Sequence, residues 1–519
     1  MATYSVLTES ARVLNEHLLE SKDIHLPQAF KEAAKLVKFV GSDIPFIPTL
    51  LKITESSSAL NALVAIACSA ISKDRYGIDY QNVEVNIDVA SLFLMSLILA
   101  TINGKSALEN SQIQTEIEKG NHYAMEKPIH RQCTNVYQTK DGRHFHLHGS
   151  MNATAAMKMV GAPEQDVFHE EAREIYMAKV AEWNADDIDR TSNDEYRQAG
   201  VICSTPDEFF ASEQGRAMEK EPLYRLKKRS APISSWPSVK DSSRPLAGIR
   251  VTDFLRVIAG PVISKVLAIL GAEVLKVTND ELPDITPTSI DFSVGKRDTN
   301  LNLKFAEGRQ NFQQLIDGAD VLIDGYCPGA LEKIGFNADS MWENNPSLIY
   351  LREKCCEFAG PLAYRSGWQQ ISDCLVALAW LQGEFFGLNE PVLPLLPNSD
   401  YQMGLAGAAA VCHALFARTK EAVTFDIDIS LTQYNIWYYR LGLYDSDQQK
   451  VLLKQKDCVS FRDYDDMSSL IMKTFATVKN CRPDLFEHPE YFQEISGKEW
   501  GIQENIKILS APFKLSNST

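Results

Sequence analysis

The stretch GIRVTDFLRVIAGPVISKVLAILGAEVLKV, residues 248–277, predicts a strand, a helix and a second strand in succession. Residues 248–254 are rich in residues that favour strands, and residues 273–277 form a short apolar run. Between them, residues 260–272 are amphipathic, with a proline near the start and a glycine near the end, which is typical of a helix. We therefore predict a β–α–β unit here.

The same alternation continues downstream. Residues 311–320 have helical periodicity, and the apolar runs VLIDGY at 321–326 and SLIYLRE at 347–353 follow, separated by another helix. Short apolar strands that alternate with helices predict an α/β fold with a parallel, doubly wound sheet. Ligands of such sheets bind outside the carboxyl ends of the strands. The rim formed by these ends is expected to contain residues 253–261, 278–280 and 325–329.

Composition and charge narrow the range of partners. The chain has 519 residues, 45% of them hydrophobic and 23% charged, which indicates an ordinary globular protein of two to four domains. The net charge is −16 and the pI is near 5.2. Such an acidic chain is not expected to bind nucleic acid or an anionic membrane. An anionic ligand would need a local basic pocket.

Location and metal binding are also predicted from simple patterns. The N-terminus lacks a basic region followed by an apolar run, so no secretory signal is expected and a cytoplasmic location is predicted. The apolar run at residues 89–102, about 14 residues long, is shorter than the roughly 20 residues that cross a bilayer, and we predict buried helices there. The ten cysteines show no zinc-ligand spacing, so no metal is predicted.

A segment rich in serine, proline and charge, residues 227–248, lacks helical periodicity and is interpreted as a linker. It divides the chain into a first half, residues 1–235, and a second half, residues 236–519. These two units are the predicted domains.

A weak internal repeat relates the two halves. ACSAI at 67–71 parallels VCHAL at 411–415, and a predicted strand follows each, VEVNIDVAS from Val83 and VTFDIDISL from Val423. The recurring order of helix, strand and helix favours a duplication over chance.

Three histidines stand at a spacing of two in HFHLHGS. His144, His146 and His148 would therefore lie on one face of a strand, where they could bind a metal or act as an acid or base. Three histidines in line on a strand have poor tetrahedral geometry, and an exposed polar face is the expected outcome. His148, beside a glycine, is the best functional candidate of the three.

LPNSDYQMGLAG, residues 396–407, places Asp400 at the start of a long helix of small apolar residues. The simpler interpretation is a helix N-cap. The alternative is a nucleophile, because the free amides and positive dipole at a helix N-terminus would keep the carboxylate ionised and steady an oxyanion. Gly404 would allow a ligand to approach closely. In the register of the repeat Asp400 is opposite Ser56, so only the second half holds this aspartate.

Several segments of the second half follow one another in a fixed order, namely PLAGIRVTDFLRVIAGP, GAEVLKV, GKRDTNLNLK, GADVLIDGYCPGALEKIGF, FAGPLAYRSGW, SDYQMG and VTFDIDISL. In their order and spacing they resemble the family III CoA-transferases over residues 245–431. This family includes formyl-CoA transferase, carnitine CoA-transferase and the α-methylacyl-CoA racemases.

The first half resembles the remaining part of the same family unit. NVYQTKDGRHFHLHGS at 135–150 and AGVICSTPDEFFASEQ at 199–214 are similar to parts of the family's small domain. The resemblance implies a Rossmann-like open parallel sheet with a smaller α+β domain, in an intertwined architecture. The first half would supply the small domain, about residues 130–215, for a site built on the second half. The chain would then be a monomeric pseudo-dimer or form a homodimer.

The resemblance implies a reaction in which CoA moves between carboxylic acids. An aspartate followed four residues later by glycine, here Asp400 and Gly404, attacks an acyl-CoA and forms first an anhydride and then an aspartyl-CoA thioester, which a second acid resolves. The implied substrates are an acyl-CoA and a carboxylic acid, with CoA itself the transferred group. Residues matching CoA contacts of the family are Arg256, Val257, Ile258, Ala259, Leu301 and Lys304, with Lys296 and Arg297 as nearby cations. Gly325 and Tyr326 stand at a further CoA-contact position, where the family usually has an asparagine and an aromatic residue.

Departures from the family pattern leave alternatives open, and the family's glycine-rich flap over the active aspartate is not recognisable here. Trp368 replaces the histidine that racemases use as a base, so racemase activity is not expected. Gln369 replaces an acid, and Asp373, one helical turn further on, is a candidate substitute for it. Cys327 replaces a basic residue. A repurposed lyase, cyclase or isomerase acting on a small molecule, or a catalytically silent binding protein, therefore remain as alternatives.

Overall fold

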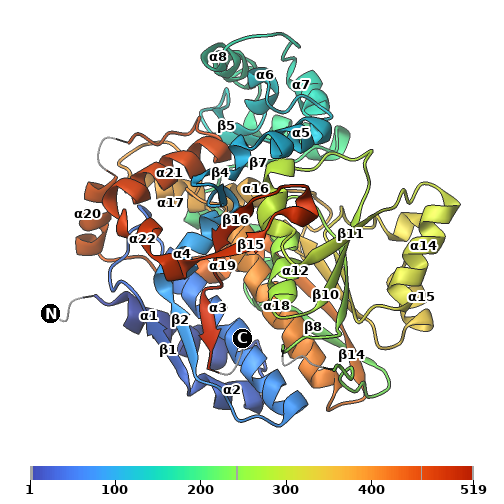
Figure 1. Ribbon diagram of the computed structural model, residues 1–519. Coiled ribbons are helices and arrows are strands. Elements are labelled where there is room, and N and C mark those ends of the chain that lie inside the picture. The colour runs from blue at the N-terminus through green and yellow to red at the C-terminus, as the bar shows by residue number, and fades with distance from the viewer. Residues whose placement is uncertain (1–3, 241–243, 457–458, 517–519) are drawn as a thin grey trace.

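The computed structural model describes residues 4–240, 244–456 and 459–516. Figure 1 shows a large body with a smaller lobe at the top. We call this the small lobe; it comprises residues 128–202 and contains α6 (Pro128–Arg131), α7 (Thr154–Val160), α8 (His169–Val180), α9 (Ala185–Arg190) and strands β5 (Asn135–Gln138), β6 (His144–Leu147) and β7 (Gly200–Ile202).

The body is built on a seven-stranded sheet with strand order β11-β10-β9-β12-β13-β14-β8. All strands from β11 to β14 run parallel, and β8 is antiparallel to β14. This is the Rossmann order, with β8 added at one edge. The predicted doubly wound α/β sheet is confirmed. Its strands are β9 (Arg250–Phe254), β10 (Glu273–Thr278), β11 (Lys296–Asn300), β12 (Val321–Asp324), β13 (Ile349–Lys354), β14 (Val423–Ser430) and β8 (Arg225–Ser230).

The predicted linker begins too early. Residues 225–230 form β8, which pairs with β14 along its length, so the first half contributes an edge strand to the sheet of the second half. In this strand Arg225 and Lys227 form ion pairs with Asp428 of β14. These contacts help to hold in place a segment that lacks helical periodicity. Residues 241–243 of the predicted linker lie outside the described residues.

Helices cover both faces of the sheet, as Figure 1 shows. On one face lie α12 (Ala259–Ile269) and α18 (Asn398–Arg418), and α3 (Ile53–Tyr76) packs against α18. On the other lie α14 (Ala306–Asp317) and α15 (Ala338–Asn344). The strand residues divide accordingly between two hydrophobic clusters, as expected from the alternation of side chains along a strand. Val251, Ile323, Ile349 and Leu351 pack with α12 and α18, whereas Leu322 and Tyr350 pack with α14 and α15.

Glycines let α12 and α18 approach closely. A Cβ atom on Gly404 would lie 2.6 Å from Cβ of Val262, and one on Gly407 would lie 2.8 Å from Cδ1 of Ile263. The space beside Gly404 is therefore filled by α12, and the small residues of α18 serve helix packing.

The two copies of the internal repeat have the same order of elements. α3, β2 (Val83–Asn86) and α4 (Ile87–Leu92) correspond to α18, β14 and α19 (Leu431–Arg440). The predicted strand of the first copy is too long, because Asn86 accepts hydrogen bonds from the backbone N–H groups of Asp88 and Val89 and starts a helix there.

Strands from the two halves of the chain pair with each other in two further sheets. In one, β17 (Phe513–Leu515) pairs with β2, which also pairs with β1 (Val37–Val40). In the other, β16 (Asn505–Leu509) pairs with both β15 (Phe492–Ser496) and β3 (Thr101–Ile102), and β3 with β4 (Lys105–Ser106). The body is therefore interlocked. No helix in the described part of the chain is long and apolar enough to cross a membrane.

Candidate active site

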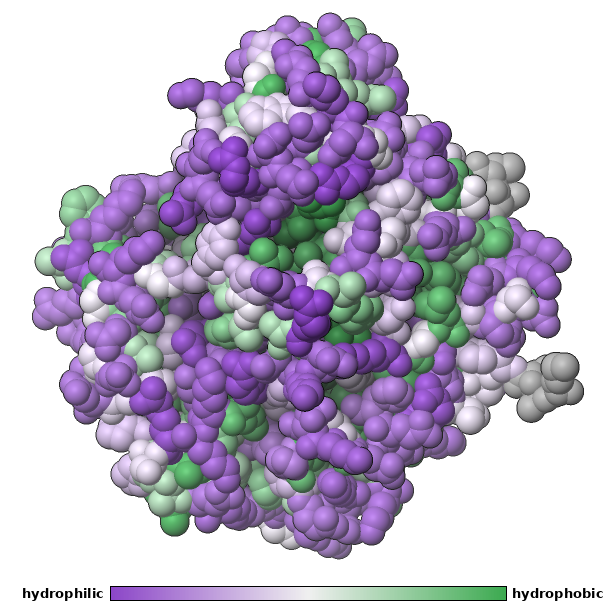
Figure 2. Space-filling view, turned by 180° about the vertical axis from the view of Figure 1, so that it is seen from behind, coloured by the Kyte–Doolittle hydropathy of each residue, from purple (hydrophilic) through white to green (hydrophobic). Residues whose placement is uncertain are grey.

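The candidate site lies at the carboxyl ends of β9, β12 and β13. The chain leaves β9 towards β10 on one side, and β12 and β13 continue on the other, so this is the topological switch point of the sheet. Figure 2 shows apolar residues gathered in a hollow below the small lobe on the face turned away from Figure 1. The carboxyl ends of the parallel strands β9, β12 and β13 lie side by side and form the predicted rim.

Asp400 lies in the first turn of α18, which packs on β13 and β14. The helix begins at Asn398, and the capping position is Pro397, with no side-chain capping bond. The N-cap interpretation of Asp400 is therefore wrong, because the helix starts earlier than the sequence suggests. Asp400 is 9% exposed, and among the described residues no hydrogen bond reaches its carboxylate.

Glu353 occupies the same face of the sheet as Asp400. Strand alternation places it on the side of Ile349 and Leu351, which pack with α18. A Cβ atom on Gly325 would lie 2.9 Å from Oε2 of Glu353, so the glycine makes room for this carboxyl. Glu353, which is partly exposed, therefore lies on the side of the sheet that α18 covers.

The electrostatic environment of Asp400 differs from the one expected. Burial, followed by the nearby carboxyls of Glu353 and Asp373, raises the pKa of Asp400 well above its usual range. The amides at the start of a helix act in the opposite direction. The expectation of a carboxylate held ionised by the helix end is corrected, because burial among other acids dominates.

Asp373 lies in α16 (Gln369–Leu375), one turn beyond Gln369 as the sequence indicates. Its carboxylate accepts hydrogen bonds from Gln369 Nε2 at 3.0 Å, Asn435 Nδ2 at 2.8 Å and Ser399 Oγ at 3.2 Å. Burial outweighs these bonds and raises the pKa of Asp373 to about 7. Asp373 is therefore adjacent to Asp400 through Ser399.

The side-chain amide of Gln369 donates two hydrogen bonds, and its carbonyl oxygen has no partner among the described residues. Its Nε2 also donates to the carbonyl oxygen of Leu396 at 3.0 Å. Its Oε1 is buried, and no partner for it is found in the described residues. This residue stands where the family has an acid, and here it orients the Asp373 carboxyl.

The small lobe meets the second half at Trp368. The ring of His148 stacks on Trp368 at 5.5 Å between centroids, and Trp368 Nε1 donates to Ser150 Oγ at 3.2 Å. His146 stacks on His148 in turn. Trp368 directly precedes Gln369, so the first half contacts the chain segment that leads to Asp373.

The expectation of an exposed histidine face is wrong. His144, His146 and His148 are all buried, because the lobe docks on the body and covers β6. Burial lowers the pKa of His146 to about 3 and that of His148 well below its usual range. A group of three or more His, Cys, Asp or Glu side chains suited to a metal is not found among the described residues.

The loop predicted to contact CoA follows β9 directly. Val257 has φ +70°, a left-handed conformation that is costly for a β-branched residue. Its N–H donates to Asp284 Oδ1 at 3.1 Å, and the Arg256 guanidinium donates to the carbonyl of Pro283 at 2.7 Å. The loop is thus fixed by residues 283–284, and Ile258 and Ala259 continue into α12.

Tyr326 joins this loop from β12. Its ring stacks on Phe254 at 4.2 Å, and the Arg256 guanidinium lies 5.2 Å from the ring centroid. Gly325 precedes it at the switch point. The structure therefore brings Arg256, Gly325 and Tyr326 together, although they are far apart in sequence.

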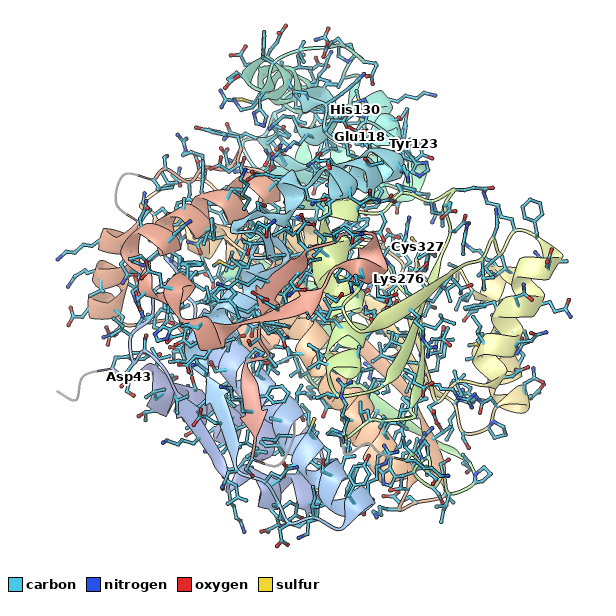
Figure 3. All side chains as sticks on the ribbon, viewed as in Figure 1. Asp43, Glu118, Tyr123, His130, Lys276 and Cys327 are labelled. Carbon is cyan, nitrogen blue, oxygen red and sulfur yellow. The ribbon has the colours of Figure 1, made fainter. Side chains whose placement is uncertain are left out.

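The remaining predicted contacts lie further out or are buried. Lys304 is 74% exposed, and Leu301 is half-buried on the segment after β11. Lys296 is not available to a ligand, because its ammonium lies 2.9 Å from Asp253 Oδ2 and 2.6 Å from Ser264 Oγ inside the protein. Figure 3 shows Lys276 and Cys327 in the region of this rim, with His130 well above them in the small lobe.

Sequence reasoning missed three acids of the site. Glu353 ends the run SLIYLRE, and strand alternation applied to that run would have pointed it towards α18. Asp324 ends β12 on the opposite face, where it accepts from Tyr350 Oη and the Tyr326 N–H. Asp284 had no local signal, since its role depends on the loop after β9.

Comparison with known proteins gives the family. Residues 246–455 match the model of CoA-transferase family III. The chain is 34% identical over 489 residues to the acetyl-coenzyme A transferase nodX of Hypoxylon pulicicidum, covering 90% of this chain and 82% of that one. It is 30% identical over 440 residues to an acyl-CoA transferase of Gibberella moniliformis, covering 81% and 77%.

A solved structure of a CAIB/BAIF family protein from Brucella suis matches a smaller part, with 25% identity, a TM-score of 0.32, and coverage of 37% of this chain and 54% of that one. The family match and the two relatives aligned over most of their length show that the chain belongs to CoA-transferase family III.

Proposed function

We propose that this CoA-transferase moves CoA between two carboxylic acids through an aspartyl-CoA thioester on Asp400. The observation that carries the proposal is the position of Asp400, an unpartnered carboxyl in the first turn of α18 at the switch point of the sheet. Most buried polar groups have hydrogen-bond partners, and one without them at a ligand-binding rim is a candidate for chemistry.

The proposed steps balance without any other reactant. The Asp400 carboxyl loses its proton to solvent, the resulting carboxylate attacks the thioester carbonyl, a C–O bond forms, and CoA leaves as a thiolate. The thiolate attacks the Asp400 carbonyl of this anhydride, releases the first acid and leaves a thioester on Asp400. A second carboxylate repeats the sequence in reverse. Free backbone N–H groups in the first turn of α18 would stabilise the oxyanions formed at this carbonyl.

The rim residues support binding of the CoA portion. Arg256 and Tyr326 present a guanidinium and an aromatic ring beside the loop at Val257. Arg256 and the outer Lys304 and Arg297 would supply the local positive charge that phosphate groups need on an acidic protein. Relatives named acyl-CoA transferases favour an acyl-CoA as the donor.

We further propose that one chain contains a complete site. The first half provides the small domain, whose His148 and Ser150 contact Trp368, and the second half provides the sheet and Asp400. The family's intertwined arrangement would thus be fused into one polypeptide, a pseudo-dimer with its catalytic carboxyl in the second half.

Mass spectrometry of the protein after exposure to a panel of acyl-CoAs tests the proposal. We expect a CoA or acyl adduct on the peptide that contains Asp400, removed by hydroxylamine and absent in Asp400→Asn. Asp317→Asn, which alters an exposed carboxyl at the end of α14, is the matched control and should still be labelled. Turnover that survives in Asp400→Asn, or the absence of any adduct with every donor, would contradict the covalent role.

A further inference from the structure

The residues on either side of Asp400 in the first turn of α18 are all bound to other parts of the protein. Asn398 donates a hydrogen bond to α19, and Ser399 donates one to α16. Tyr401 binds a buried carboxylate, and Gln402 binds the backbone at the start of α3. Of these side chains, Asp400 alone has no hydrogen-bond partner among the described residues. Because α18 lacks a side-chain N-cap, these lateral bonds hold its first turn.

Tyr401 is fully buried, and its hydroxyl joins two distant parts of the chain. It donates to Oδ2 of Asp291 at 3.1 Å, in α13 (Ser289–Phe292) of the second half. It accepts the backbone N–H of Leu97 at 3.2 Å, in the short helix η2 (Phe93–Ile98) of the first half. One hydroxyl group on α18 is thus fixed by elements from both halves.

A buried ion pair fixes the acceptor of this hydrogen bond. Lys265 Nζ, on α12, lies 2.6 Å from Asp291 Oδ1 and 3.2 Å from Ser96 Oγ. Ser96 Oγ also donates to Asp291 Oδ2 at 2.7 Å, and all three side chains are buried. The Asp291 carboxylate therefore has one cation and two hydroxyl donors, the second being Tyr401. A buried carboxylate with a cation and several donors is held in one position.

Aromatic rings surround this polar cluster. The ring of Phe93 meets the Tyr401 ring edge to face at 5.2 Å between centroids, and the ring of Phe292 lies 5.7 Å from it. The Lys265 ammonium lies 4.9 Å from the Phe93 centroid and 5.6 Å from the Phe292 centroid. Hydrogen bonds are stronger in such poorly solvated surroundings, and loss of one leaves a buried polar group unpaired. The cluster is therefore a rigid anchor for the start of α18.

We propose that Tyr401 is a positioning residue for Asp400. Its hydroxyl fixes the rotation and depth of the first turn of α18, and this turn presents the Asp400 carboxyl to the thioester. Attack on a carbonyl requires the reacting atoms to be aligned at about 3–3.5 Å, so a small displacement of the turn slows the reaction. Through Leu97, the first half of the chain helps to set the position of the carboxyl. The inference rests on the proposed function of Asp400.

Tyr401→Phe tests the anchor, because it removes the hydroxyl and keeps the ring. Formation of the adduct on Asp400 is followed in a single turnover by quenching and mass spectrometry, over a range of acyl-CoA concentrations. We expect the rate at saturation to fall by about tenfold or more, since alignment is lost. The half-saturating concentration should stay unchanged, because the CoA rim is untouched.

Tyr444→Phe is the matched control. The hydroxyl of Tyr444 also donates to a buried carboxylate, Oε2 of Glu55, at 2.8 Å. Glu55 lies in the first turn of α3, the counterpart of α18 in the repeat, where Ser56 stands opposite Asp400. This variant loses a hydrogen bond of the same kind and should lose stability to a similar extent. Its saturating rate and half-saturating concentration should match those of the wild type.

A wild-type saturating rate in folded Tyr401→Phe overturns the inference. An equal fall in Tyr444→Phe also overturns it, because lost stability would then be the cause. Ser96→Ala, which removes the other hydroxyl donor to Asp291, is used if Tyr401→Phe does not fold. It should lower the same rate, and an unchanged rate in this variant likewise counts against the anchor.

The transferase proposal and the anchor can fail separately. If Asp400 is labelled and Tyr401→Phe reacts like the wild type, only the positioning role fails. If wild-type Asp400 is never labelled, the transferase proposal fails, and amide hydrogen exchange of residues 396–405 decides whether the anchor exists. Faster exchange there in Tyr401→Phe than in Tyr444→Phe supports the anchor, and equal exchange overturns it.

Discussion

Gly404 shows how the absence of one side chain sets the position of Asp400, one helical turn away. A methyl group at this position would lie 2.6 Å from Val262 and 3.1 Å from the carbonyl oxygen of Ala259. Gly404→Ala is therefore expected to lower the free energy of unfolding by about 1–3 kcal/mol, as overpacking does, despite the better helix propensity of alanine.

Urea unfolding of Gly404→Ala and of the double variant Gly404→Ala/Val262→Ala measures this effect. The double variant should recover only part of the loss, because the second change removes Val262 Cγ1 but leaves Val262 Cβ, which also lies 2.6 Å from the added methyl group. A single variant as stable as the wild type would show that α12 moves away freely.

Glu55 is a buried acid whose titration should be visible in the stability of the protein. The hydroxyl groups of Tyr4 and Tyr444 donate to its two oxygens at 2.7 and 2.8 Å, yet burial raises its pKa from 4.5 to about 7. Because the native state binds this proton more tightly than the unfolded state, its contribution to stability is present below about pH 4.5 and is lost as pH rises through about 7.

Glu55→Gln removes this pH-dependent term. The difference in free energy of unfolding between wild type and variant should therefore change by about 3 kcal/mol, in favour of the variant, between pH 4 and pH 8. Urea titrations at several pH values provide the measurement. A difference that stays constant over this range would mean that Glu55 does not titrate with a raised pKa.

At the scale of elements, β11, β9 and α12 are joined by one buried ion pair. Lys296 contacts Asp253 and Ser264, and the side chains of both charged partners are at most 2% exposed. Lys296→Met leaves Asp253 buried without its cation and is expected to cost about 3–5 kcal/mol in stability. Asp253→Asn/Lys296→Met should cost clearly less, as measured by urea unfolding, because no charge is left buried. Equal losses in the single and double variants would argue against this electrostatic cause.

The sheet was predictable from the sequence, whereas parts of the site were not. Apolar runs such as 321–326 and 347–353 predict strands, because a parallel strand that is covered on both faces of the sheet needs apolar residues throughout. Asp400 was identified through family resemblance, but its environment depends on Glu353, which a distant strand provides. The histidines of β6 were expected to be exposed, and only the docking of the lobe on Trp368 explains their burial.

At the scale of the whole molecule, the two halves should not fold separately. β8 completes the edge beside β14, β17 pairs with β2, and β16 pairs with β3. We expect fragments 1–235 and 236–519 to aggregate when produced singly and to form a one-to-one complex when produced together. Size-exclusion chromatography and near-ultraviolet circular dichroism give the readout. Cooperative unfolding of either fragment alone would contradict the expectation.

This interlocking was beyond prediction from sequence pattern. The sequence pattern at residues 83–86 and 513–515 predicts only that each segment is a short strand. Local periodicity does not say which distant strand will be its partner. A resemblance to an intertwined family suggested that the halves cooperate, but the strand register had to come from the structure.

The pairing of β17 with β2 also has a consequence for synthesis on the ribosome. β2 emerges several hundred residues before its antiparallel neighbour at 513–515 is translated. Throughout elongation β2 therefore lacks one neighbour, and its backbone groups on that side remain open to other partners. Nascent chains should depend on chaperones until residues 513–515 have been translated, and variants truncated before Phe513 should be degraded rather than accumulate.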